Sequence, residues 1–276
     1  MSKYWFLLLI PIILGAYFLF NDNRNIIIIT GTETPPFEYY QDGKLVGIDI
    51  VFLERIFSKL NIEYKIELVD WEEALNKMKR GEADLILGAG YTEERESYLS
   101  YRDEQKLFET GQTAEVPKDV LWLSNEAFIY PKEKNFDVSS LEIIKEKDYS
   151  VGIVAGYYYF KSLWDTELNI YAYPTTEKLI QALENNEIDM ILIDTLEGFS
   201  VMDSLNIDSE KYKISKPYNQ GGNYLLFSKK YDKPKYAKIK NEFYDELIRL
   251  KEEENLHETA YLEYTGMNFS ELYSLS

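Results

Sequence analysis

Two stretches decide the fold: "EEALNKMKRGEADLILGA" at residues 72–89 and "EKLIQALENNEIDMILID" at residues 177–194. Each has the pattern of an amphipathic helix that leads into a short apolar strand. Aligned without a gap, they pair apolar residues with apolar residues and acids with acids: Leu75 with Ile180, Met78 with Leu183, Glu82 with Glu187 and Asp84 with Asp189. Two copies about a hundred residues apart favour two lobes of similar α/β build.

The sequence around the two copies extends this pattern. In the first half, strands and helices alternate, with strands at 25–32, 62–69 and 83–90, helices at 49–60 and 71–82, and a turn-rich hairpin at 35–49. In the second half, strands are predicted at 149–156 and 169–174, before the helix and strand of 175–194. Such alternation is typical of a mainly parallel, doubly wound sheet with helices on its faces.

The chain passes between the lobes twice. Segments at 120–148 and 213–230 fit two connections that carry it from lobe 1 to lobe 2 and back, and helical C-terminal sequence then closes lobe 1. We expect lobe 1 to contain residues 26–122 and 223–276, and lobe 2 to contain residues 123–222 with the hinge segments.

The N-terminus carries an export signal. Residues 1–20 hold one lysine and then a nearly unbroken apolar run over residues 4–20. This run is long for a signal core and short for a membrane span. Residues 1–25 are therefore either a cleaved signal peptide or an uncleaved membrane anchor. In both cases we expect a periplasmic or extracytoplasmic protein, and an anchored one would sit on the inner membrane.

Composition excludes several kinds of function. The net charge of −18 argues against nucleic acid and against docking on anionic lipid. With no cysteine, the chain has no disulfide framework and no thiolate metal site. Its single histidine, His257, makes a histidine-built metal site or a Ser-His-Asp triad improbable, and we expect it at the surface of a charged helix. We expect no metal and no cofactor.

Three strand ends provide candidate binding residues, because ligands of open parallel sheets bind beyond the carboxyl ends of the strands. The first strand is followed by Thr34 and Phe37, the third by "GAGYTEER", and the strand of the second copy by an acid. The candidates at these ends are Thr34, Phe37, Gly88, Gly90, Thr92, Arg95 and Asp194.

Arg95 and Asp194 have complementary charges on opposite lobes. The planar guanidinium of Arg95 suits a carboxylate, and Asp194 suits an ammonium, so together they describe a clamp for a zwitterion. Each also has a structural interpretation. Arg95 could pair with a neighbouring glutamate, while Thr92 and Asp194 could cap helices. Phe37 and Trp71 could be core aromatics or could wall a pocket.

Several segments resemble the family-3 extracellular solute-binding proteins, which include the amino-acid-binding proteins of ABC transporters. They are "TPPFEYYQDGKLVGIDIVFLERIFSKL", "VDWEEALNKMKRGEADLILGAGYTEERESYLSY", "YSVGIVAGYYYFKSLW" and "NNEIDMILID", and the resemblance covers residues 26–262. It implies a type II periplasmic-binding fold, with two lobes joined by two hinge strands. The loop before Arg95 is one residue shorter than in well-known amino-acid binders, which indicates a divergent branch.

The resemblance also implies roles for site residues. Arg95 matches the arginine that binds the ligand α-carboxylate, and Asp194 matches the acid that binds the α-amino group. Thr34, Phe37 and Trp71 match wall positions, and Tyr157 and Tyr158 match the loop that opens lobe 2.

The implied function is capture of a small polar carboxylate, such as an amino acid, by hinge closure. The partner would be an ABC permease, the protein would be a monomer, and no catalysis is expected. Two alternatives remain: a sensory binding module at the membrane, and a dehydratase-like enzyme. The dehydratase would draw its general acid from Glu33, Glu38 or Glu197.

Overall fold

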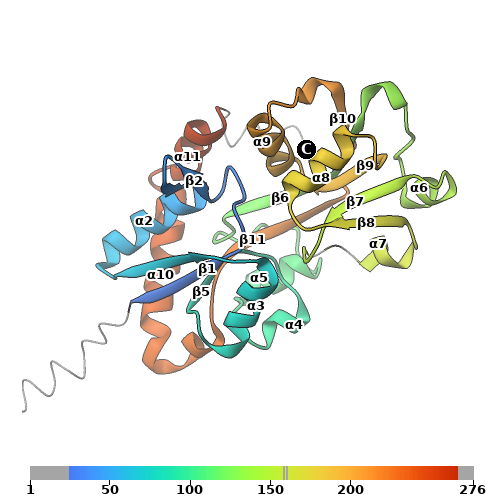
Figure 1. Cartoon of the computed structure of the whole chain (residues 1–276). Helices are drawn as coiled ribbons and strands as arrows, with labels where there is room; N and C mark the ends of the chain where they lie inside the picture. The colour runs from blue at the N-terminus through green and yellow to red at the C-terminus, as the bar shows by residue number, and fades with distance from the viewer. Residues whose placement is uncertain (1–24, 158, 160, 267–276) are drawn as a thin grey trace, which may run out of the picture.

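The structure of the protein, a computed structural model, describes residues 25–157, 159 and 161–266. Residues 1–24 of the predicted export segment lie outside the described residues. Figure 1 shows two α/β lobes, with strands β6 (Trp122–Pro131) and β11 (Asn219–Phe227) running between them. The predicted lobe boundaries at 122/123 and 222/223 fall on these two strands and stay predictions.

A single path of paired strands runs through both lobes, in the order β4-β1-β5-β11-β6-β9-β7-β8, and β10 pairs with β6. In lobe 1 the parallel strands are β1 (Ile26–Thr30), β4 (Tyr64–Leu68) and β5 (Leu85–Ala89). In lobe 2 they are β7 (Ser150–Val154), β8 (Asn169–Tyr173) and β9 (Met190–Asp194). β11 and β6 pair antiparallel with each other and with the strand beside each of them. Each lobe is therefore a mainly parallel sheet with one antiparallel strand toward the hinge, as the type II fold requires.

The helices cover the sheets as the sequence patterns predict. Lobe 1 carries α2 (Ile48–Leu60), α3 (Trp71–Arg80), α4 (Glu93–Glu96), α5 (Asp103–Glu109), α10 (Pro234–Glu252) and α11 (Leu256–Thr265). Lobe 2 carries α6 (Leu141–Glu146), α7 (Lys161–Asp165), α8 (Thr176–Glu184) and α9 (Thr195–Ser204). The shorter elements are β2 (Tyr39–Gln41) and β3 (Lys44–Val46), which form the predicted hairpin, β10 (Tyr212–Ile214), and the 3-10 turns η1 (Lys132–Lys134), η2 (Ser209–Lys211) and η3 (Lys229–Asp232).

The two sequence copies fold alike, as α3–β5 and α8–β9. The aligned acids Asp84 and Asp189 precede their strands and bind the neighbouring strand in the same manner. Asp84 accepts a hydrogen bond from the Ile27 backbone N–H at 2.9 Å, and Asp189 accepts one from the Ser150 N–H at 2.8 Å. Each acid thereby fixes the start of the neighbouring parallel strand, and a hydrogen bond to a charged acceptor is among the stronger ones.

Apolar residues of the strands and of one face of each helix form the cores. Lobe 1 has a large cluster between β1, β5, β11 and helices α2, α10 and α11, while lobe 2 has clusters on both faces of its sheet. Removal of this apolar surface from water is the main term that stabilises each lobe.

The prediction that His257 is a surface residue was wrong. Its ring lies 5.0 Å from the ring of Phe52, and burial lowers the pKa of this imidazole to about 3. The helix pattern of α11 is only weakly amphipathic, so the buried face of this helix could not be predicted from the pattern.

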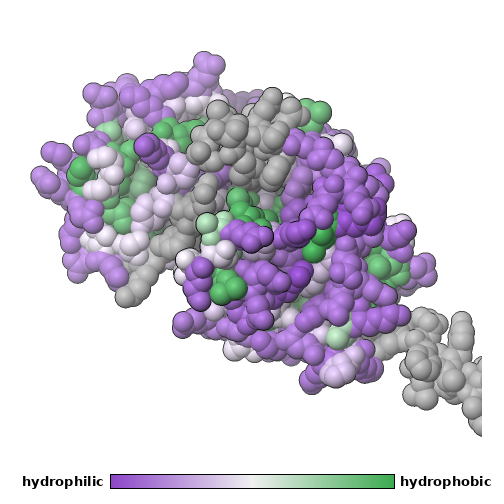
Figure 2. Space-filling view, turned by 180° about the vertical axis from the view of Figure 1, so that it is seen from behind, coloured by the Kyte–Doolittle hydropathy of each residue, from purple (hydrophilic) through white to green (hydrophobic). Residues whose placement is uncertain are grey.

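The face of the molecule in Figure 2 is covered mainly by hydrophilic residues, with apolar residues scattered among them. This agrees with the large net charge of the chain. Among the residues that the structure describes, no helix is both long enough and apolar enough to cross a membrane.

Candidate functional site

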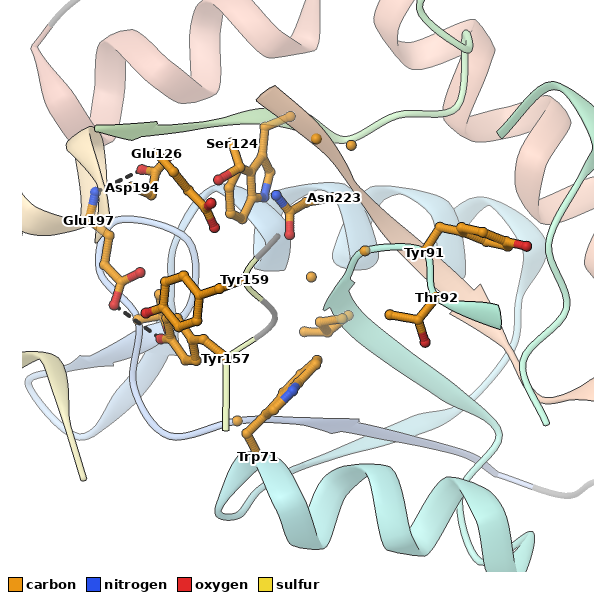
Figure 3. Close-up of a pocket in the computed structure, with 18 of the residues that line it drawn as sticks. Trp71, Tyr91, Thr92, Ser124, Glu126, Tyr157, Tyr159, Asp194, Glu197 and Asn223 are labelled. Atoms are coloured by element: carbon orange, nitrogen blue, oxygen red, sulfur yellow. Dashed lines mark hydrogen bonds between the residues drawn. The ribbon is translucent and has the colours of Figure 1, made fainter. Parts of the chain in front are cut away.

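A cavity of about 610 Å³ lies between the lobes, where the carboxyl ends of the lobe 1 strands face lobe 2. Its size lies within the range of about 300–1,000 Å³ that is usual for small-molecule sites. Figure 3 shows Trp71 and Thr92 on one side and Tyr157, Tyr159 and Glu197 on the other. Of the ten predicted site residues, eight line this cavity: Thr34, Trp71, Gly88, Gly90, Thr92, Arg95, Tyr157 and Asp194.

Arg95 is buried in the lobe 1 wall, with 6% of its surface exposed. Its backbone N–H donates a hydrogen bond to the Thr92 hydroxyl at 3.1 Å, so Thr92 is the N-cap of α4, in agreement with the structural interpretation of this residue. The guanidinium donates from Nη1 to the Gly90 carbonyl at 3.1 Å and lies 5.5 Å from the ring centroid of Trp71. Within the described part of the chain, no carboxylate forms an ion pair with Arg95. The surface-pair interpretation is therefore not realised, and this buried cation faces the cavity without a counter-ion.

The rest of the lobe 1 wall is made of small groups and one large ring. Trp71 begins α3 and stacks beside the arginine, which gives a cation–π contact as well as a flat surface. Gly88 and Gly90 contribute backbone only, so a ligand can approach the strand end closely. Thr34 pairs with Glu38 in an isolated bridge at the rim.

Phe37 does not line the cavity, which corrects its predicted role as a pocket wall. It is 1% exposed, and its ring stacks on that of Trp122 with centroids 3.8 Å apart. Trp122, at the start of the hinge strand β6, lines the cavity in its place. The direction of the Phe37 side chain could not be predicted from the alternation of residues along a strand, because Phe37 lies in a turn.

Asp194 lies at the end of β9 and caps α9. Its Oδ1 accepts hydrogen bonds from the backbone N–H groups of Leu196 and Glu197 at 3.0 and 3.1 Å, and Oδ2 accepts one from Asn125 at 2.8 Å. Burial raises the pKa of Asp194, and these donors oppose the rise. The helix-cap interpretation therefore holds, while its contact with a ligand ammonium stays a prediction.

Glu197 lies one turn after Asp194 and faces the cavity (Figure 3). The pattern Asp-x-x-Glu is that of a capping box, in which the glutamate would bond back to the cap backbone. Here Oε1 instead accepts hydrogen bonds from the hydroxyls of Tyr157, at 3.1 Å, and Thr176. Burial raises the pKa of Glu197 to about 7. Tyr157 thus contacts an acid of its own lobe, and Tyr158 lies outside the described residues.

Several other residues of the cavity wall were not among the predicted binding residues. These are Glu38, Glu93, Glu109, Trp122, Ser124, Glu126, Tyr159 and Asn223. Trp122, Ser124 and Glu126 occupy alternate positions of hinge strand β6. Because side chains of a strand alternate between its two faces, these residues become predictable once the hinge is located. Glu38 was noted only as a nearby carboxylate. It is buried, and its Oε1 accepts a hydrogen bond from the Thr30 hydroxyl at 2.8 Å.

The cavity wall is strongly acidic. Of the described residues that line it, one is an arginine and six are acids: Glu38, Glu93, Glu109, Glu126, Asp194 and Glu197. Among the residues that the structure describes, no group of three or more acids, histidines or cysteines is arranged to hold a metal ion. The arrangement suits a small ligand that brings both an anionic group and positive charge.

Comparison with known proteins finds a family that part of the chain resembles. Residues 26–148 match the family description "Bacterial extracellular solute-binding proteins, family 3". Over these residues the chain is similar to the family-3 solute-binding proteins. The matched part of the chain includes Arg95 and the whole first copy of the helix–strand unit, and it ends before the second copy.

Two relatives come from Bacillus subtilis (strain 168). The probable amino-acid-binding protein YxeM is 22% identical over 173 residues, which cover 61% of this chain and 59% of YxeM. The arginine-binding extracellular protein ArtP is 22% identical over 200 residues, which cover 66% of this chain and 70% of ArtP. The match to YxeM thus spans less than two thirds of that protein's length.

Among solved structures, a histidine kinase sensor domain with similarity to periplasmic binding proteins superposes with a TM-score of 0.70. It is 14% identical, and the match covers 88% of this chain and 96% of that one. At this identity the likeness shows the fold alone.

Proposed function

We propose that this protein is exported and captures an amino acid between its lobes, and that it presents the closed complex to an ABC permease. One observation carries the proposal: Arg95 is buried in the wall of an interlobe cavity and has no carboxylate partner among the described residues. A buried charge is costly unless it is paired, so a ligand carboxylate in this cavity would relieve that cost.

The other wall complements the amino group. Asp194 and Glu197 lie in lobe 2, on the far side of the cleft from Arg95, and a ligand ammonium can interact with their negative charges. Only a ligand that contacts both walls is stabilised fully, so binding favours the closed arrangement of the lobes. A permease or another partner can then distinguish the closed form from the open form. The named relatives are binding proteins, which supports binding rather than catalysis.

Calorimetric titration of the purified protein with the L-amino acids tests the proposal. We expect at least one of them to bind, and Arg95→Ala to weaken its affinity by at least about 30-fold, as for loss of one partner of a buried charge pair. Arg80→Ala is the matched control, because Arg80 pairs with Glu73 and Glu82 at the surface of α3. Absence of binding by every amino acid, or unchanged affinity in Arg95→Ala, would overturn the proposal.

A further inference from the structure

The cavity has more acidic side chains than an ordinary zwitterion can pair with. A neutral amino acid brings one carboxylate for Arg95 and one ammonium for the acids, of which there are six. As the lobes close, water leaves and the remaining negative charges interact more strongly. The wall residues thus favour a ligand whose net charge is positive.

Two of the six acids already have several donors from the protein. Glu109 Oε1 accepts hydrogen bonds from the Gly222 backbone N–H at 2.7 Å and from the Tyr224 hydroxyl at 2.8 Å. Asp194 accepts the three backbone donors described above. Glu109 and Asp194 therefore have hydrogen-bond donors within the protein and do not need a ligand to provide them.

Glu38 and Glu197 differ from these two acids. Each is buried, with 5% and 4% of its surface exposed, and each lines the cavity. In each, Oε1 accepts the hydrogen bonds given above, and Oε2 accepts none from the part of the chain that the structure describes. Each buried carboxylate thus has one oxygen available to a donor that the described protein groups do not provide.

The two acids come from opposite lobes. Glu38 follows the first strand of lobe 1, whereas Glu197 lies in the first turn of α9 in lobe 2. They are close enough for the charge of Glu197 to add to the rise in the pKa of Glu38, behind burial and the charge of Asp49. When both are ionised, their charges repel each other across the cleft. A ligand cation between them would replace this repulsion with two attractions and so would favour the ionised form of both acids.

We infer that the ligand carries a second positive charge, which is held between Glu38 of lobe 1 and Glu197 of lobe 2. The ligand is then a cationic amino acid: its carboxylate meets Arg95, and its side-chain cation joins the two lobes. This inference rests on the proposed function and adds the substrate class to it.

Isosteric ligand pairs test the charge directly on the unmodified protein. L-arginine and L-citrulline have nearly the same shape, but the side chain of citrulline is neutral, and L-lysine and L-norleucine form a second pair. We expect the cationic member of at least one pair to bind at least about 30-fold more tightly in calorimetry, as for a hydrogen bond to a buried charge. Equal affinities within both pairs would overturn the inference and leave amino-acid capture intact. Binding of no amino acid would overturn both.

A variant then assigns the preference to its residue. Glu197→Gln keeps the shape of the side chain and removes its charge, so the ratio of affinities within the preferred pair should fall by about 10-fold or more. Asp203→Asn removes a charge from an exposed position of the same helix and should leave the ratio unchanged. An unchanged ratio in a folded Glu197→Gln protein would contradict the role of Glu197. If that variant does not fold, the ligand pairs on the unmodified protein still decide the substrate class.

Discussion

Arg95 and Asp194 show how hydrogen-bond partners, and not charge alone, separate a binding group from a structural one. Both are buried at the edge of the same cavity. Asp194 has three backbone donors from two elements, so its charge is stabilised before any ligand arrives. Arg95 has a carbonyl and an aromatic face, and no carboxylate within the described residues. The lack of a carboxylate partner for Arg95 among the described residues therefore indicates an anionic ligand more strongly than Asp194 indicates a cationic one.

The titration of Glu197 gives a prediction for stability. Its pKa is about 7 in the folded protein, against an ordinary value of 4.5, because burial disfavours the charged form. The folded state therefore holds this proton more tightly than the unfolded state. The stabilisation is fully present below pH 4.5 and is lost as the pH rises to about 7. At 1.36 kcal/mol for each pKa unit, the loss is about 3 kcal/mol.

Urea unfolding of the ligand-free protein at pH 5 and pH 8 measures this loss, with Glu197→Gln as the comparison. The titratable groups whose pKa values are linked to Glu197 are Asp194, Glu38, Tyr157 and Tyr159, and all of them remain in the variant. The difference between the two proteins isolates Glu197, because other acids contribute to both. We expect the variant to gain stability relative to the unmodified protein on going from pH 5 to pH 8. A constant difference would show that Glu197 titrates near its ordinary pKa.

At the level of elements, the repeated helix–strand unit was predictable because its signals are local. Helical spacing, a C-terminal Gly81 and an apolar strand lie within one short stretch, and both copies folded as expected. The direction of single side chains was not predictable in the same manner. The side chain of Phe37 lies in the core, where its ring stacks on that of Trp122, a residue distant in the sequence. The side chain of Glu197 faces the cavity because hydroxyls of two distant residues, Tyr157 and Thr176, donate hydrogen bonds to it.

The turn before α2 provides a prediction at the same scale. Gly47 has a φ of 129°, and a Cβ on it would lie 2.1 Å from the Phe37 carbonyl oxygen. That carbonyl accepts the Asp49 N–H at 3.0 Å and belongs to the loop that carries Glu38. We expect Gly47→Ala to destabilise the protein by about 2–4 kcal/mol, because backbone strain and a backbone clash act together.

Gly43 is the matched control for this substitution. It also has a positive φ, of 75°, but a Cβ there would meet nothing within 4 Å. Gly43→Ala should therefore cost only about 1 kcal/mol, the strain of the φ alone. Urea unfolding of the two variants compares the costs. Equal losses would mean that contact with the Phe37 carbonyl adds nothing to the cost at Gly47.

At the scale of the whole molecule, the hinge determines how the two walls meet. Strands β6 and β11 pair with each other and with the sheets of both lobes. Rotation of one lobe against the other must therefore be absorbed within these two paired strands. A Cβ on Gly156 of lobe 2 would lie 4.0 Å from Cδ1 of Trp71 in lobe 1, so the two lobes already approach each other at this edge of the cleft. A ligand that contacts both walls can shift the equilibrium toward closure without rearranging either core.

The absence of cysteine from the sequence makes this movement measurable with two introduced labels. Glu72, exposed on α3 of lobe 1, and Lys178, exposed on α8 of lobe 2, can be replaced by cysteines and spin-labelled. We expect the distance distribution between them to become shorter and narrower when a bound amino acid saturates the site, because the ligand favours the closed population. A control pair at Glu72 and Lys238, both within predicted lobe 1, should show no change. Binding that leaves the distribution between the lobes unaltered would exclude capture by hinge closure, while any change within the control pair would point to rearrangement inside lobe 1.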